Sequence, residues 1–220
     1  MREPSSETYL ELGRGVYSAE RAAALAGVPV STLHYWARKE LYRPSISPEP
    51  RVRFWSWMDL LALRMIDWLR HEGPQGLKPR VPISRIRKAL GELDQLGIPP
   101  EAFHEVIMVT RDGSLFIRSA DNSVSALPGR QQAWTTMLEV VRPYKTGPDL
   151  LEPRPLLRII PGKLHGEPHL LDTRITSAAV YALYQAGYDI PAIREMYPEV
   201  IPAALHEAID LEHTLESPAA

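Results

Sequence analysis

The sequence predicts a mainly helical protein with a small β component, built as three successive parts. Two short amphipathic segments joined at Gly27 indicate a compact helical front. A β-branched stretch interrupted by Asp112-Gly113 is typical of a hairpin in the middle. Three short helical segments with abrupt stops predict a helical back. We therefore expect domains at residues 1–98, 99–150 and 151–220.

Two helices and a tight turn open the front domain. Ser18 is a good N-cap for an alanine-rich helix that should end at Gly27. A second helix is expected from residue 30 to about Lys39, with Pro29 turning the chain into it. Its apolar positions share one side and should face the core: Leu33, Trp36 and Ala37. This order predicts a helix-turn-helix, whose second helix enters a major groove of DNA.

The segment that follows predicts a wing and a third helix. Residues 42–50 contain three prolines and should be irregular, because proline removes a backbone donor and fixes φ. Residues 51–55 alternate as a short strand does. Ser56 and Asp59 form an acidic capping box, which predicts a helix up to about Arg70. The front domain should thus be a winged helix-turn-helix.

A loop and one more helix should complete this domain. Gly73, Pro74 and Gly76 indicate a loop over residues 71–82. A helix is expected over residues 81–96, ended by Gly97. Its inward positions are expected to be Ile83, Ile86, Leu90 and Leu93, and its outward basic positions Arg85, Arg87 and Lys88.

The middle of the chain reads as a β-hairpin followed by a helix. Residues 106–110 and 115–118 are the expected strands. Because a single hairpin is marginal in water, it needs a partner, and we expect residues 106–117 and the helix 131–141 to form a dimer interface. Residues 143–155 carry four prolines and one glycine, which is typical of a linker.

The back domain should contain three short helices after a short strand at residues 156–160. Thr176 is the expected cap of a helix over residues 177–185, and Asp189 of one over residues 191–196. The last helix should begin at Pro202 and end near Leu215.

Charge is divided unevenly along the chain, although the net charge is only −2. Residues 1–90 hold 15 Lys and Arg against 9 Asp and Glu, a net charge of +6. The remainder holds 10 against 18, a net charge of −8. A basic front half suits a domain that binds phosphates, although a solvated surface with chance clustering would give the same count.

Composition limits the classes of function. The chain has no cysteine, so a disulfide, a thiolate zinc site or a cysteine nucleophile is excluded. No apolar run approaches a membrane span, and the N-terminus does not read as a signal peptide. We therefore expect a cytoplasmic protein without a membrane partner.

The front domain resembles the winged helix-turn-helix of the MerR type. The matching segments are Ala-Gly-Val-Pro-Val-Ser-Thr-Leu-His-Tyr-Trp (26–36), Arg-Val-Arg-Phe-Trp-Ser-Trp-Met-Asp-Leu (51–60) and Pro-Ile-Ser-Arg-Ile-Arg-Lys-Ala-Leu (82–90). Three positions depart from the family pattern: Pro29 stands where Ser or Thr usually caps, and Ser31 and His34 stand where Arg is frequent. The resemblance implies the placement of the helix in DNA rather than particular base contacts.

The back domain resembles a short domain of unknown function found in VapB-type antitoxins. The matching segments are Gly-Glu-Pro-His-Leu-Leu-Asp-Thr-Arg-Ile-Thr (166–176), Gln-Ala-Gly-Tyr-Asp (185–189) and Tyr-Pro-Glu-Val-Ile (197–201), ahead of Ala-Leu-His-Glu-Ala-Ile (204–209). Asp172 replaces the second glycine of that motif, which argues against a positive φ there. The resemblance implies the antitoxin of a VapBC-like pair, whose toxin is a PIN-type ribonuclease.

Candidate DNA-binding residues lie on the second helix and the wing. They are Ser31, Thr32, His34, Tyr35, Arg38, Lys39, Arg43, Arg51 and Arg53. The alternative for the arginines is simple solvation, and His34 and Tyr35 could equally pack beneath the wing. Three tryptophans are expected in the core rather than as stacking platforms: Trp36, Trp55 and Trp57.

No pattern in the sequence predicts catalysis, a metal or a cofactor. His165 and His169 flank Glu167, but two histidines without a third ligand on a helix are better explained as a polar loop. His206-Glu207 lacks the second histidine of a zinc-protease helix, because Asp210 stands in its place. Arg174 is expected to pair with Asp172 or a backbone carbonyl and to brace the turn.

Two hypotheses from different classes follow. The first is an antitoxin that binds operator DNA as a homodimeric autorepressor and neutralises a PIN-type ribonuclease. The second is a stand-alone MerR-like transcriptional regulator whose middle region senses a small molecule. A weaker third is a metal-dependent enzyme that uses the His-rich back segment.

Overall fold

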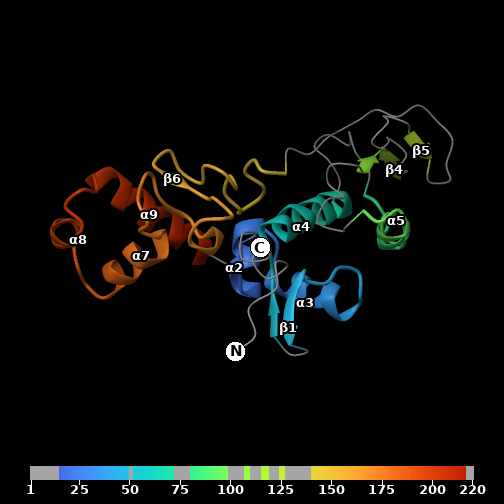
Figure 1. Ribbon diagram of the computed structural model, residues 1–220, viewed down its shortest axis with the longest axis horizontal. Coiled ribbons are helices and arrows are strands. Elements are labelled where there is room, and N and C mark those ends of the chain that lie inside the picture. The colour runs from blue at the N-terminus through green and yellow to red at the C-terminus, as the bar shows by residue number, and fades with distance from the viewer. Residues whose placement is uncertain are drawn as a thin grey trace, which may run out of the picture.

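The computed structural model confirms a mainly helical protein with a small β component (Figure 1). It describes residues 15–49, 52–71, 80–98, 107–109, 115–118, 124–126 and 140–216. Within these ranges, no helix is both long and apolar enough to cross a membrane. In Figure 1 the C-terminal helices lie at one end of the molecule and the helix of residues 83–95 lies at the other, with the N-terminal helices between them.

The helix-turn-helix forms as predicted, with α2 (Ala19–Ala26) and α3 (Val30–Arg38). The Ser18 hydroxyl accepts a hydrogen bond from the Arg21 amide, and Gly27 ends α2 with φ of 69°. Glycine is required there for a second reason as well. A Cβ on Gly27 would lie 2.2 Å from the carbonyl oxygen of Tyr144, so the turn is packed directly against the later chain.

The wing is a two-stranded antiparallel sheet, β1 (Ile46–Glu49) and β2 (Val52–Phe54). The prediction of an irregular segment over residues 42–50 was wrong for β1. Pro48 is compatible with the strand because each strand of this sheet has only one neighbour, and proline is tolerated at such edges. The predicted strand β2 is confirmed, and its neighbour Trp55 bridges to Tyr17.

Helix α4 (Trp57–Arg70) begins with the predicted capping box of Ser56 and Asp59. Asp59 is fully buried, and its carboxylate also accepts hydrogen bonds from the Ser45 amide (3.0 Å), the Ser45 hydroxyl (2.7 Å) and the Tyr42 hydroxyl (2.7 Å). One carboxylate therefore joins the start of α4 to the chain that enters the wing.

Helix α5 (Ile83–Gln95) carries the expected apolar face, with Ile86, Leu90 and Leu93 buried and Ile83 half-buried. It packs near a sheet of three antiparallel strands: β3 (Ile107–Val109), β4 (Leu115–Arg118) and β5 (Val124–Ala126). The predicted hairpin is β3–β4, and β5 was not predicted. Of the helix expected over residues 131–141, residues 131–139 lie outside the described residues, and Val140 and Val141 lie in a turn.

The segment expected as a linker, residues 143–155, is packed against the N-terminal helices. Its anchor is Arg64 of α4, which is fully buried. The guanidinium donates to the carbonyls of Val140 (3.0 Å), Arg142 (2.5 Å) and Pro148 (2.5 Å), and to that of Leu25 in α2 (2.7 Å). Burial lowers the pKa of Arg64 to about 9, so the side chain is still a cation at neutral pH.

The C-terminal unit contains the three predicted helices, α7 (Ser177–Gln185), α8 (Ile190–Met196) and α9 (Pro202–Glu216). Thr176 and Asp189 cap α7 and α8 through their side chains, as predicted. The expected strand is β6 (Leu157–Arg158), which pairs with β7 (His169–Leu170). A short 3-10 turn, η3 (Leu164–Gly166), lies between the two strands.

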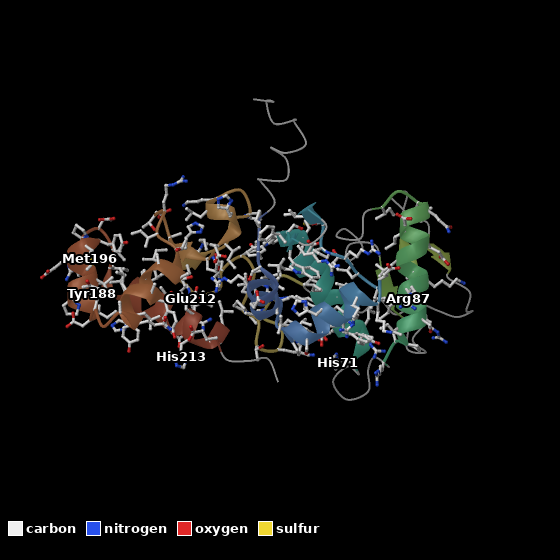
Figure 2. The ribbon with its side chains drawn as sticks, turned by 90° about the horizontal axis from the view of Figure 1, so that it is seen from below. His71, Arg87, Tyr188, Met196, Glu212 and His213 are labelled. Atoms are coloured by element: carbon white, nitrogen blue, oxygen red, sulfur yellow. The ribbon has the colours of Figure 1, made fainter. Side chains whose placement is uncertain are left out.

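An ion-pair network joins this unit to the helix-turn-helix. Arg21 of α2 lies 2.7 Å from the carboxylates of both Glu167 and Glu212, and the Ser177 hydroxyl also donates to Glu212. Next to it, the Tyr17 hydroxyl donates to the Gly166 carbonyl (2.7 Å). In Figure 2 Glu212 lies between the C-terminal helices and the N-terminal ones, and α9 contacts α2.

Candidate nucleic-acid interface

Helix α3 has a buried apolar face, and its opposite, polar face is exposed. Leu33, Trp36 and Ala37 are buried as predicted, which fixes the rotation of the helix about its axis. The predicted contact residues therefore lie at the surface: Ser31, His34, Tyr35, Arg38 and Lys39 are exposed, and Thr32 is half-buried. Tyr35 is 43% exposed, so it does not pack beneath the wing.

The wing and the turn after α3 carry the other predicted arginines. Arg53 lies on β2 and is exposed. Arg43 is also exposed, but its guanidinium forms an ion pair with Glu40, which offsets part of its charge. Arg51 lies outside the described residues. Trp36 and Trp55 are buried and Trp57 packs against the core, as predicted.

A groove runs beside α3 on the side of α4 and α5. It has a volume of about 560 Å³. Its lining comes from α3, the C-terminal end of α4 and the start of α5: Thr32, Tyr35, Trp36, Asp67, Arg70, His71, Arg80 and Ile83. Arg70 and Arg80 line the same groove, and partial burial and the charge of Arg80 lower the pKa of Arg70. An anion between two such cations would relieve their repulsion.

Helix α5 extends this basic surface. Arg87 donates to the carbonyl of Lys39 (3.3 Å), which places the basic face of α5 beside the C-terminal end of α3. Figure 2 shows Arg87 at the end of the molecule that α5 occupies. Arg85 and Lys88 are exposed on the same helix.

The sequence did not single out Arg70, Arg80 or Arg87 as binding residues, although it predicted the exposure of Arg87. Arg70 and Arg80 flank a loop rich in glycine and proline. This position next to a loop was the one feature of the sequence that could have indicated them as binding residues. Their proximity to Tyr35 depends on how α4 and α5 pack, which spacing along the chain does not reveal.

The His-rich back segment does not converge on a site. His169 is buried, and burial lowers its pKa, whereas His165 is exposed. Glu167 is held by Arg21. Across the described ranges, no three His, Cys, Asp or Glu side chains are grouped so that they could hold a metal ion.

Two other polar residues of the C-terminal unit, Glu207 and Asp210, form contacts within that unit. The Glu207 carboxylate accepts from the Leu156 amide (2.7 Å), and Asp210 pairs with Arg154 (2.8 Å). Arg174 was expected to brace the turn, but it is exposed and makes no hydrogen bond or ion pair with any described residue. Asp172 nevertheless keeps a positive φ of 59°, a region that Asp tolerates better than most residues.

Residues 17–75 match the family described as MerR HTH family regulatory protein, so the chain carries a MerR-type helix-turn-helix at its N-terminal end, the fold of a DNA-binding regulator. Residues 158–210 match a family described as protein of unknown function (DUF433). A crystal structure of Rv2018 from Mycobacterium tuberculosis is similar with a TM-score of 0.47 at 19% sequence identity, covering 88% of this chain and 96% of that chain. No curated protein matches the sequence.

Proposed function

We propose that this protein binds operator DNA through its N-terminal domain as a transcriptional repressor. The observation that carries the proposal is the exposed polar face of α3 with basic side chains on the neighbouring elements. Arg53 is exposed on strand β2 of the wing, Arg70 and Arg80 line the groove beside α3, and Arg87 contacts the carbonyl of Lys39 at the C-terminal end of α3. Helix α3 would enter the major groove, while the flanking arginines would contact the phosphates.

The further part of the proposal is that the protein is an antitoxin. The C-terminal unit would bind and neutralise a PIN-type ribonuclease, as the resemblance of its motif to VapB-type antitoxins implies. Its acidic charge supports this, because a nuclease that binds RNA needs a basic surface. We also propose a homodimer, since two copies would read two half-sites, with the sheet β3–β4–β5 as a candidate contact.

The test of DNA binding is the salt dependence of affinity for a duplex from the promoter of the protein's own gene. We expect Arg53→Ala with Arg80→Ala to weaken binding and to reduce the slope of log K against log salt by about 1 per lost phosphate contact. Arg174→Ala is the matched control, because it removes an exposed arginine of the C-terminal unit that pairs with no described residue. Unchanged affinity and slope in the double variant would refute the proposed interface.

The test of the antitoxin role uses the product of the adjacent gene. Co-expressed with the full chain, a PIN-type nuclease should co-purify with it and lose its ribonuclease activity. If that product is not a nuclease, or if it is not inhibited, the antitoxin role fails while the DNA-binding role stands.

One observation favours the alternative, a regulator that senses a small molecule. A cavity of about 360 Å³ lies between the turn of the helix-turn-helix and the end of α9. Its floor is apolar, with Val28, Pro29 and Leu215, and Glu20 and Glu216 add carboxylates. A ligand there would touch both domains, and an operator complex released by a small molecule alone would favour this function.

A further inference from the structure

The C-terminal unit exposes three large side chains with apolar surface on α7, on α8 and on the turn between them. Tyr184 is 48% exposed, Tyr188 43% and Met196 45%. Figure 2 shows Tyr188 and Met196 both at the far end of the molecule from Arg87. We call these three residues the distal patch.

Other residues of α7 and α8 form the buried core of the C-terminal unit. Helix α7 turns Val180 and Tyr181 inward, and it makes its main contact with α9. Helix α8 buries only Ile193. Tyr184 stacks on Tyr181, with ring centroids 6.5 Å apart, but like Tyr188 and Met196 it remains exposed.

These residue types are those that protein interfaces use. Tyrosine and methionine are enriched where proteins meet, and a few such anchors can carry most of the binding free energy. A partner that covers the patch would remove this apolar surface from water, which favours association.

The charges around the patch restrict the partner. Residues 177–201 carry three acidic side chains, Asp189, Glu195 and Glu199, against the single basic Arg194, and all four are exposed. A second copy that met this face symmetrically would bring acidic side chains next to acidic side chains, and their repulsion would oppose binding. DNA is disfavoured for the same reason. The complement is a protein surface with an apolar centre and a basic rim.

We propose that the distal patch is the docking surface for a basic protein partner. In identifying that partner as a ribonuclease toxin, the inference rests on the function proposed above. The surface and the chemistry of its occupant follow from the side chains alone. The partner would sit at the opposite end of the molecule from α5, so it would leave the basic interface accessible to DNA (Figure 1).

The experiment measures the affinity of the full chain for the purified product of the adjacent gene. Tyr188→Ser with Met196→Ser should weaken binding at least tenfold. Glu195→Lys with Glu199→Lys should also weaken it, and added salt should reduce the difference from wild type. The matched controls lie at the other end: Leu96→Ser, at a side chain 59% exposed, and Asp94→Lys, at an exposed carboxylate; neither should change the affinity. Patch variants that bind as the controls do would overturn the proposal.

A second measurement separates this inference from the antitoxin function. A photo-crosslinking amino acid replaces Tyr188 in cells, with Leu96 as the control site, and the crosslinked protein is identified and its affinity for the same variants measured. A basic protein that is not a nuclease, and whose binding the patch variants weaken, would support the patch and refute the antitoxin role. Crosslinks only to a second copy of the chain, or none, would refute the patch.

Discussion

Two arginines that pair with acidic residues of α9 show how burial changes the contribution of an ion pair to stability. Arg21 meets Glu212 with side-chain exposures of 17% and 6%, whereas Arg154 meets Asp210 with exposures of 26% and 67%. Burial lowers the pKa of Arg21, but the hydrogen bonds and charges of Glu212 and Glu167 outweigh it and raise the pKa above its ordinary value. Arg21 is therefore a cation that the fold requires, and removing it would leave Glu212 charged, buried and without its arginine.

We expect Arg21→Met to lower the free energy of unfolding by about 3–5 kcal/mol, the usual result of breaking one side of a buried pair. Arg154→Met should cost about 0–1 kcal/mol, because its partner is solvated. Urea denaturation of both variants measures the difference. The double variant Arg21→Met with Glu212→Met should recover part of the loss, since no buried charge is then left alone. Equal losses for Arg21 and Arg154 would contradict this account.

The wing and helix α4 depend on each other through Asp59. Its carboxylate accepts from the Ser56 amide (2.7 Å) in the capping box and from Ser45 and Tyr42 in the chain that enters the wing. The residue does not face the proposed DNA surface, because it is fully buried. It can affect DNA binding only by holding the wing in position relative to α3.

Asp59→Ala should therefore weaken operator binding although it removes no DNA contact. Losing the capping-box bond from the Ser56 amide and the three hydrogen bonds from Ser45 and Tyr42 should cost about 2–4 kcal/mol of stability. Hydrogen exchange should quicken in residues 45–54 more than in α7–α9, which distinguishes a released wing from general unfolding. Glu92→Ala is the control, because Glu92 pairs only at the surface with Lys88 (3.8 Å). Unchanged hydrogen exchange in the wing would show that the hydrogen bonds of Asp59 do not hold the wing in position.

Local signals in the sequence were enough to predict most helices. Ser18, Ser56, Thr176 and Asp189 are caps that act within three residues of themselves, so the start of each helix is encoded where it forms. Strand β1 was missed because its Ser-Pro composition disfavours a strand, and only pairing with β2 creates one. Strand β5 was missed for a similar reason, since it depends on β4 as its neighbour.

The candidate site was predictable only where a single helix builds it. The exposed face of α3 followed from the periodicity of Leu33, Trp36 and Ala37. The contributions of Arg70 and Arg80 did not, because they depend on the packing of α4 and α5 beside Tyr35. The contact of Arg21 with Glu212 spans 191 residues and has no sequence signature at all.

At the scale of the whole molecule, the two proposed binding surfaces lie apart but are mechanically joined. The basic interface is built on α3, the wing, α4 and α5, and the distal patch on α7 and α8. Helix α2 lies between them and contacts both α3 and α9. Arg64 adds a second connection, since it binds the Leu25 carbonyl of α2 and the segment that leads to the C-terminal unit.

This arrangement predicts that DNA binding protects the C-terminal unit. A promoter duplex that fixes α2 and α3 should slow hydrogen exchange in α9, because opening α9 would break the Arg21–Glu212 pair against an immobilised α2. Arg21→Met should abolish this protection at saturating DNA. Arg154→Met is the control, because it removes an ion pair of α9 that does not reach α2, and it should leave the protection intact. Linkage then requires that a partner bound to the C-terminal unit through this connection change operator affinity by the same factor by which DNA changes partner affinity. The two ends of the molecule would act independently if DNA did not change hydrogen exchange in α9 of the wild type. The same conclusion would follow if the protection persisted in Arg21→Met.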